Sequence, residues 1–403
     1  MRTSALVLLT LAACTEQRAP ISGPSSIKVD IVTPSDLGST TTRLNNLASV
    51  VVNLTVLDAD GQVDTTFTND LQTYVQFLGT LTPYLDQPPL QTIKMVAGKA
   101  ANVTVALPPT FGPTTLWFDD GQDVNPTYVT GSSLPIWFHD PFIRDIQMPA
   151  SETALDALSA SPLQNKNIDV AASRYGADGR LVVSSVFAQG YTIQDMNCPG
   201  GHAPCTTGPY DSLLIFTFSA PQYTNDENRI DILSQGQQMR RFTGGVSEFD
   251  GLTEIGFPQN FPAFDANKQP IIDPTLEPTP IKIEAGRAGE TNNWFAPLSD
   301  PQGIINFERY EAAPVELDNA TVCPLDANYT TYQQWRVDPA GGAGCTGKNV
   351  LNVISAGAIS TLDPATLVGK TLPRLVGILR PVSIGTFNVW IVYPRASADL
   401  TLP

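Results

Sequence analysis

Histidine, positive charge and long apolar runs are all scarce in this chain of 403 residues. Its 2 histidines are His139 and His202, whereas nucleophilic triads and most catalytic metal sites need imidazole beside serine, cysteine or carboxylates. Lys and Arg number 23 against 39 Asp and Glu, so the net charge is −16 and the basic footprint that nucleic-acid phosphate requires is missing. We therefore predict no catalytic residue, no metal ligand and no cofactor.

The carboxylates form two patterns that resemble catalytic or metal sites. Residues 58–64 space three aspartates around Gly61, as in an EF-hand loop, but Asn69 stands where the bidentate glutamate is required. Because Asp-x-Asp-Gly is also a good hairpin turn, a turn is favoured there. Glu308 with Glu311, and residues 226–231, leave a carboxylate-based hydrolase open as an alternative.

Helix-forming runs are also few, while proline (34) and glycine (30) are abundant. This composition is typical of strands joined by turns. With 42% hydrophobic residues, the chain can bury more than one core. We expect an all-β protein of several domains.

Five cysteines are present, and four of them lie in two local groups. Sequence proximity favours the disulfides Cys198–Cys205 and Cys323–Cys345 among the three connectivities that four cysteines allow. A four-cysteine metal site is disfavoured because no Cys-x-x-Cys spacing occurs. The fifth cysteine, Cys14, therefore needs a separate explanation.

Cys14 ends a leader of one positive charge and a short apolar run, which are the parts of a secretory signal. The run is too short to cross a bilayer of about 30 Å as a helix. Leu11-Ala12-Ala13-Cys14 resembles the lipobox of bacterial lipoproteins, which implies a signal peptide at 1–13 and lipid on Cys14; the alternative is an ordinary signal with a chance cysteine. Thr15, in place of Asp, favours the outer membrane by the same resemblance. Residues 14–26, which are polar and rich in Pro and Ser, read as a flexible tether.

Residues 27–144 alternate between apolar and polar positions, with turn signals at intervals typical of a β-sandwich. The segment 50–67 resembles a hairpin of bacterial Ig-like domains. This resemblance predicts an N-terminal Ig-like β-sandwich.

Two later regions share a different pattern. Gly190-Tyr191-Thr192-Ile193-Gln194-Asp195 and the segment 236–255 resemble the OB-fold domains found beside extracellular bacterial nucleases, which implies an OB-like β-barrel over 145–258. The glycine spacing of Gly236 and Gly244 recurs at Gly369 and Gly377, so we predict a second OB-like barrel over 301–403. Residues 259–300, rich in Pro and Asp, would form the linker.

Aromatic and basic residues on these strands are the candidate binding positions, because OB barrels stack bases or sugar rings on one face. The candidates are Tyr191, Phe216, Arg240, Arg241, Trp335 and Trp390. The competing interpretation is that aromatics in strands form the core.

The combined reading is a lipid-anchored outer-membrane protein with a non-enzymatic structural or binding role at the cell envelope. Its expected partners are the membrane, through the anchor, and an envelope protein or polysaccharide. The alternatives are a binding protein for single-stranded nucleic acid or polysaccharide, which the acidic charge disfavours for nucleic acid, and the carboxylate-based hydrolase.

Overall fold

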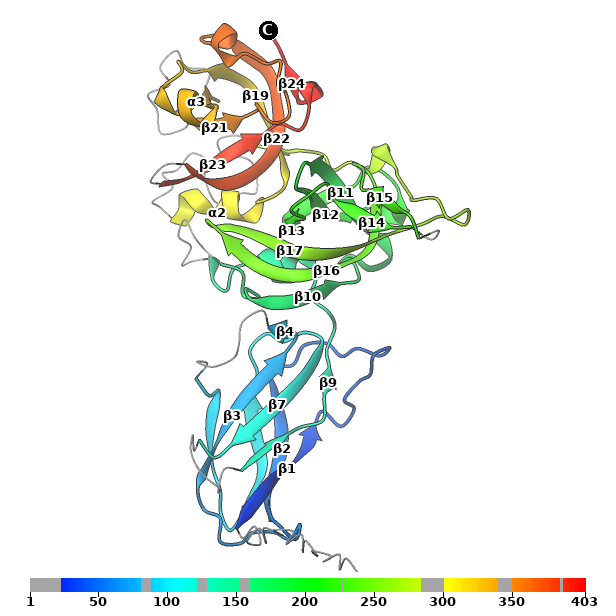
Figure 1. Cartoon of the computed structure of the whole chain (residues 1–403), viewed down its shortest axis with the longest axis vertical. Helices are drawn as coiled ribbons and strands as arrows, with labels where there is room; N and C mark the ends of the chain where they lie inside the picture. The colour runs from blue at the N-terminus through cyan, green and yellow to red at the C-terminus, as the bar shows by residue number, and fades with distance from the viewer. Residues whose placement is uncertain are drawn as a thin grey trace, which may run out of the picture. The chain divides into compact units, whose positions relative to one another are not determined.

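The computed structural model describes residues 23–80, 88–121, 129–152, 160–225, 228–283, 301–339, 345, 350–384 and 387–403. The chain divides into two compact units, Met1–Phe77 with Asp86–His139 (unit 1) and Leu78–Leu85 with Asp140–Pro403 (unit 2). Strands dominate both units (Figure 1), which confirms the prediction of an all-β fold. Cys14 and the leader lie outside the described residues.

Unit 1 consists of two antiparallel sheets. The first has the order β1 (Pro24–Thr33), β2 (Ser49–Asp58) and β6 (Lys99–Ala106). The second has the order β5 (Gln91–Lys94), β3 (Asp70–Phe77), β7 (Pro113–Asp119) and β8 (Thr130–Ser132), with β9 (Ile136–Trp137) also paired to β7. Alternation sets the buried faces: Val50, Val52, Leu54 and Val56 of β2 are all buried.

Unit 2 contains two closed five-stranded barrels, as predicted. The first runs β11 (Gly179–Phe187), β12 (Gly190–Asn197), β13 (Thr206–Phe216), β17 (Leu252–Pro262) and β16 (Gln238–Phe249), and β16 pairs back onto β11. Only β13 and β17 are parallel within this ring of described strands. Outside it, β10 (Lys166–Val170) pairs with β16, and β4 (Gly79–Thr80) pairs with β10.

The second barrel repeats this order. Its strands are β19 (Pro314–Val322), β20 (Gln334–Asp338), β21 (Leu351–Ile354), β23 (Phe387–Tyr393) and β22 (Thr371–Ile384), and β22 closes onto β19. The parallel pair is again formed by the third and fifth strands, β21 and β23. Two short strands extend the sheet, β18 (Ile281–Lys282) and β24 (Leu400–Thr401).

The repeated glycines occupy equivalent places in the two barrels. Gly236 and Gly369 precede the fourth strand with φ of 78° and 76°, a left-handed backbone that favours glycine. A Cβ on Gly244 would lie 2.7 Å from the carbonyl oxygen of Gly256, and one on Gly377 would lie 2.7 Å from the carbonyl carbon of Tyr393. The repeat therefore records a close approach of the fourth and fifth strands.

Both predicted disulfides are confirmed. Cys198–Cys205 closes the turn between β12 and β13, and Cys323–Cys345 joins the end of β19 to the segment after β20. Leu276 packs on the first disulfide and on Val182, so this part of the predicted linker is folded against the first barrel. The predicted linker bounds are corrected at both ends, because β17 runs to Pro262 and Ile281 and Ile283 pack in the core of the second barrel. Residues 284–300 lie outside the described part of the chain.

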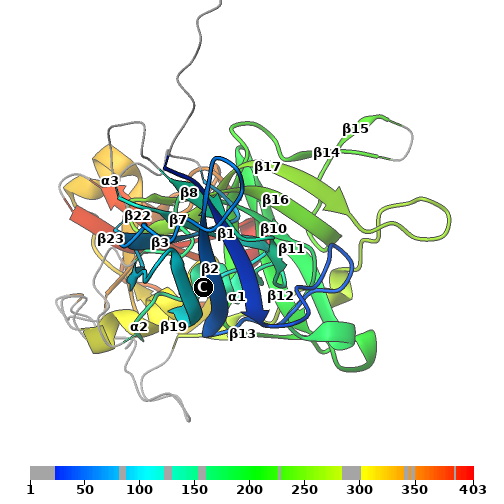
Figure 2. The same cartoon turned by 90° about the horizontal axis from the view of Figure 1, so that it is seen from below.

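Short elements complete unit 2. The helices are α1 (Ile143–Gln147), α2 (Pro301–Arg309) and α3 (Ala327–Tyr332). A hairpin of β14 (Gln222–Thr224) and β15 (Ile230–Ile232) extends beyond β16 and β17 of the first barrel (Figure 2). None of the helices in the described residues has the length and apolar character needed to cross a membrane.

Candidate ligand-binding site

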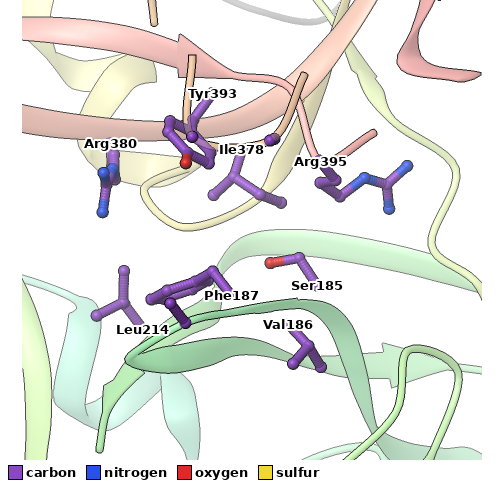
Figure 3. Close-up of a pocket in the computed structure, with 11 residues that line it drawn as sticks. Ser185, Val186, Phe187, Leu214, Ile378, Arg380, Tyr393 and Arg395 are labelled. Atoms are coloured by element: carbon purple, nitrogen blue, oxygen red, sulfur yellow. The ribbon is translucent and has the colours of Figure 1, made fainter. Parts of the chain in front are cut away.

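A groove lies between the two barrels of unit 2. One section has a volume of about 390 Å³ and the adjoining section about 490 Å³. The first barrel contributes the β11–β12 turn, the end of β13 and the β16–β17 turn, and the second barrel contributes β22 and β23. The side chains common to both sections are Phe187, Ala188, Leu214, Arg380 and Tyr393. Arg380 and Tyr393 point into the gap from one wall, and Phe187 and Leu214 form the other (Figure 3).

Buried hydrogen bonds fix the two walls relative to each other. Gln194 Nε2 of β12 donates to the carbonyl oxygen of Ala312 (3.1 Å), and the Thr253 backbone N–H of β17 donates to Glu311 Oε1 (3.0 Å). Arg395 Nη1 reaches back to the carbonyl oxygen of Ser184 (3.0 Å). Polar groups buried in an interface cost free energy unless they are paired. These bonds therefore hold the barrels in one arrangement, and the groove is part of the fold.

Arg380 is the groove cation that forms no ion pair with a described side chain, although the charge of Glu254 acts on it from a distance. Its guanidinium lies over the Tyr393 ring, 4.9 Å from the centroid. Nε is buried without a hydrogen-bond partner, and none of the described side chains forms an ion pair with it. Burial lowers the pKa of Arg380 from its ordinary value, although a guanidinium stays protonated in proteins. A partly desolvated, unpaired guanidinium is a strong donor for a ligand hydroxyl or anion.

The second groove arginine is already satisfied. Arg395 Nε and Nη2 donate to the two oxygens of Asp399, at 3.0 and 2.8 Å. An arginine held by a carboxylate in this bidentate way has little charge left for a ligand. Arg380 is therefore the groove arginine that is available to contact a ligand.

Glu254 supplies an acceptor in the same groove. It is half-buried on β17, and burial raises its pKa above the ordinary value for a glutamate, while Arg380 acts in the opposite direction. The two groups are more than a salt-bridge distance apart, because no ion pair joins them among the described residues. A donor and an acceptor thus face a gap lined by rings, of which Phe249 is 65% exposed.

Of the residues predicted from sequence, only Phe216 lines the groove. Tyr191, Trp335 and Trp390 are buried in the barrel interiors, so their ring faces pack against protein rather than against solvent. Arg241 pairs with Asp169 at 2.7 Å, and its neighbour Arg240 is exposed on β16 away from the groove residues.

The described carboxylates that resemble catalytic or metal sites, and the two histidines, lie outside the groove. Asp58 Oδ1 accepts from the backbone N–H groups of Asp60 and Gln62, at 2.9 and 2.8 Å, which confirms the hairpin turn. Glu311 is 3% exposed, and burial followed by the charge of Glu308 raises its pKa well above the ordinary value. It serves the contact between barrels, and no groove gives a substrate access to it among the described residues.

The remaining candidates offer no cluster. The His139 ring packs edge-on against Phe111 at 5.5 Å, and His202 is exposed in the Cys198–Cys205 turn. Asp226 and Glu227 lie outside the described residues. Within the part of the chain that the structure describes, no group of three His, Cys, Asp or Glu side chains is arranged to hold a metal ion.

Sequence reasoning did not bring Phe187, Glu254, Arg380 and Tyr393 together at one site, although Arg380 and Tyr393 belong to the basic and aromatic residues that the barrels offer. Each is unremarkable within its own strand, and the groove exists only because two barrels meet. The internal repeat was the one available signal, since it places two similar barrels in succession. No protein-family model, curated protein or solved structure matches the chain.

Proposed function

We propose that the chain is a lipid-anchored outer-membrane protein that binds a hydroxyl-rich or anionic ligand in the groove between its barrels, without catalysis. The observation that carries this proposal is the unpaired guanidinium of Arg380, held over Tyr393 in a groove with aromatic walls. Burying a charge without a partner lowers stability. Such a residue is therefore expected to be kept for a ligand.

The barrel topology supports the same proposal. In OB-fold barrels, the turns between the first and second strands and between the fourth and fifth strands take part in binding oligonucleotides and oligosaccharides. Here those turns, represented by Phe187 and Asp250, both line the groove. We propose OB-like barrels for unit 2 and an Ig-like spacer role for unit 1, with the ligand held at the cell envelope.

Replacing Arg380 by Gln tests the groove. The measurement is retention of the detergent-solubilised full-length protein on immobilised polysaccharides and on single-stranded DNA, at low salt. We expect Arg380→Gln to weaken binding about tenfold or more, because a charged hydrogen bond contributes about 1.5–3 kcal/mol. The melting temperature should not fall, since the substitution removes a desolvated, unpaired charge.

Arg374→Gln provides the matched control. Arg374 lies on the same strand, pairs with Glu316 at 2.8 Å and is outside the groove, so its loss should leave binding unchanged. Equal binding by wild type and Arg380→Gln would refute the groove as the site. Retention of neither ligand class by the wild-type protein would refute the proposed binding role.

The anchor is tested separately at Cys14. In a Gram-negative host, we expect the wild-type chain to incorporate labelled palmitate and to fractionate with the outer membrane, because two or more acyl chains bind a bilayer stably. Cys14→Ser should remain unlabelled and leave the outer-membrane fraction. Thr15→Asp should stay labelled but move to the inner membrane. Unchanged labelling of Cys14→Ser would contradict the proposal.

A further inference from the structure

Three phenylalanines form a continuous row of ring contacts on the first barrel, one edge-to-face (66°) and one tilted (36°). Phe216 ends β13, Phe218 follows it, and Phe257 belongs to β17. The Phe216 and Phe218 ring centroids are 4.5 Å apart, and those of Phe218 and Phe257 are 5.0 Å apart. Phe218 is 55% and Phe257 79% exposed. We call these three residues the aromatic track.

Two of these rings are carried by residues with an unfavourable backbone conformation. Phe218 and Phe257 have φ of 59° and 52°, in the left-handed region that disfavours side chains larger than glycine. The register between β16 and β17 steps from Thr243↔Gln259 to Gly245↔Gly256, so Phe257 lies in a β-bulge. Bulges re-aim side chains, and strained exposed residues concentrate at functional sites. Neither ring contributes to a core.

The aromatic track begins in one hollow and ends beside a residue that lines another. Phe216 lines the groove between the barrels. Pro258, next to Phe257, lines a second hollow of about 380 Å³ beside the β14–β15 hairpin, together with Gln222, Tyr223, Thr224, Ile230, Gln259, Asn260 and Phe261. The aromatic track therefore leads from the groove to the strand segment that lines the second hollow.

The polar groups along this path are mainly amides and carboxylates. Gln189 and Glu254 lie at the groove end, and Gln222, Gln259 and Asn260 lie at the far end. The described residues that line the second hollow include no lysine or arginine, whereas a nucleic-acid path needs them to contact phosphates. Rings with amides and little positive charge suit a ligand with apolar faces and neutral hydroxyl groups. A neutral sugar chain has this chemistry.

We propose that an extended, neutral polysaccharide binds along the aromatic track, with one end in the groove beside Arg380 and successive sugar rings on Phe216, Phe218 and Phe257. This inference rests on the proposed binding function of the groove and names its ligand class. Strand order places the track along β13 and β17, the parallel pair of the first barrel.

The test uses an array of linear oligosaccharides of graded length, in neutral and uronate-bearing series, with single-stranded DNA as a third series. We expect the full-length protein to prefer the neutral series, with affinity that rises with length. Phe257→Gly and Phe218→Gly should each weaken binding of the longest neutral oligomers about tenfold, the value of one ring contact, and leave the shortest unaffected. Glycine suits both backbone positions, so the melting temperature should be kept.

Two further variants separate this inference from the proposed function. Tyr332→Ala removes an exposed ring of α3 outside the track and should change nothing. Arg380→Gln should weaken short and long oligomers alike. If Arg380→Gln weakens binding but affinity neither rises with length nor responds to Phe257→Gly, the track is refuted and the groove stands. If only the phenylalanine variants weaken binding, the groove is refuted.

Two outcomes would overturn the sugar assignment itself. One is a preference for uronate oligomers or DNA over the neutral series. The other is self-association of the protein, seen as a concentration-dependent mass in light scattering and abolished by Phe257→Gly, which would make a second copy the occupant of the track.

Discussion

Three residues of the segment Gly190–Asp195 each have a defined structural role in the first barrel. A Cβ on Gly190 would lie 2.3 Å from the carbonyl oxygen of Ile215, so only glycine fits. The Tyr191 hydroxyl donates to Asn260 Oδ1 at 2.7 Å. Asp195 accepts from Ser173 Oγ and from the backbone N–H of Arg174. The pattern thus specifies a turn, a buried tyrosine and a buried carboxylate that organises a loop.

Burial of Asp195 makes stability depend on pH. Desolvation raises its pKa to about 6, against the two hydrogen bonds that favour the ionised form, while the unfolded value is about 3.9. Because the folded state binds this proton more tightly, the contribution to stability is present below pH about 4 and is lost as pH rises through about 6.

Asp195→Asn removes that titration and resembles the protonated aspartate. Between pH 4 and 7, we expect the free energy of unfolding to shift in favour of the variant by about 2 kcal/mol relative to wild type. Urea denaturation across this pH range measures the difference. Asp60→Asn, at an exposed turn, is the control. A constant difference between Asp195→Asn and wild type would contradict the buried titration.

The residue scale is also where sequence prediction was weakest. The sequence offers Tyr191, Trp335 and Trp390 as binding residues because they are aromatic. Successive side chains of a strand point to opposite faces, and in the structure each of these three points into a barrel interior. The same alternation places Arg380 on the outer face of β22, in the groove. Nothing in the sequence of that strand indicates that Arg380 forms no ion pair. Whether a side chain is paired depends on residues far away in the sequence.

At the scale of elements, glycine spacing was the most informative signal. Gly244 and Gly377 were aligned by sequence, and each lies where the fifth strand passes too close for a side chain. The same spacing predicted two barrels, and the structure contains two with one strand order. A close approach of two backbones leaves no room for a side chain, so the glycine at that position can be recognised in the sequence.

Substituting these glycines tests their structural role. Gly244→Ala and Gly377→Ala each add a Cβ within 2.7 Å of neighbouring backbone atoms, so we expect each to lower the free energy of unfolding by about 1–3 kcal/mol. Gly256→Ala is the control, because a Cβ there meets nothing within 4 Å. Calorimetry would measure the melting temperatures. Equal effects from Gly244→Ala and Gly256→Ala would show that the close approach is relieved without cost.

At the scale of the whole molecule, the sequence predicted an all-β chain and two barrels but not the surface between them. Ala312 and Glu311 receive hydrogen bonds from the first barrel, although they directly precede the second. The sequence around them reads only as the approach to a strand. Contacts between domains depend on how two finished surfaces fit, which local patterns do not encode.

The hydrogen bonds between the barrels have a consequence for the proposed ligand binding. The walls of the groove are fixed by the fold, because Gln194, Thr253 and Arg395 form hydrogen bonds across the contact between the barrels. A preorganised site loses little entropy on association and needs no closing motion. Under the proposed function, we therefore expect binding to need no change of shape, with an affinity set by the aromatic rings and the Arg380 guanidinium.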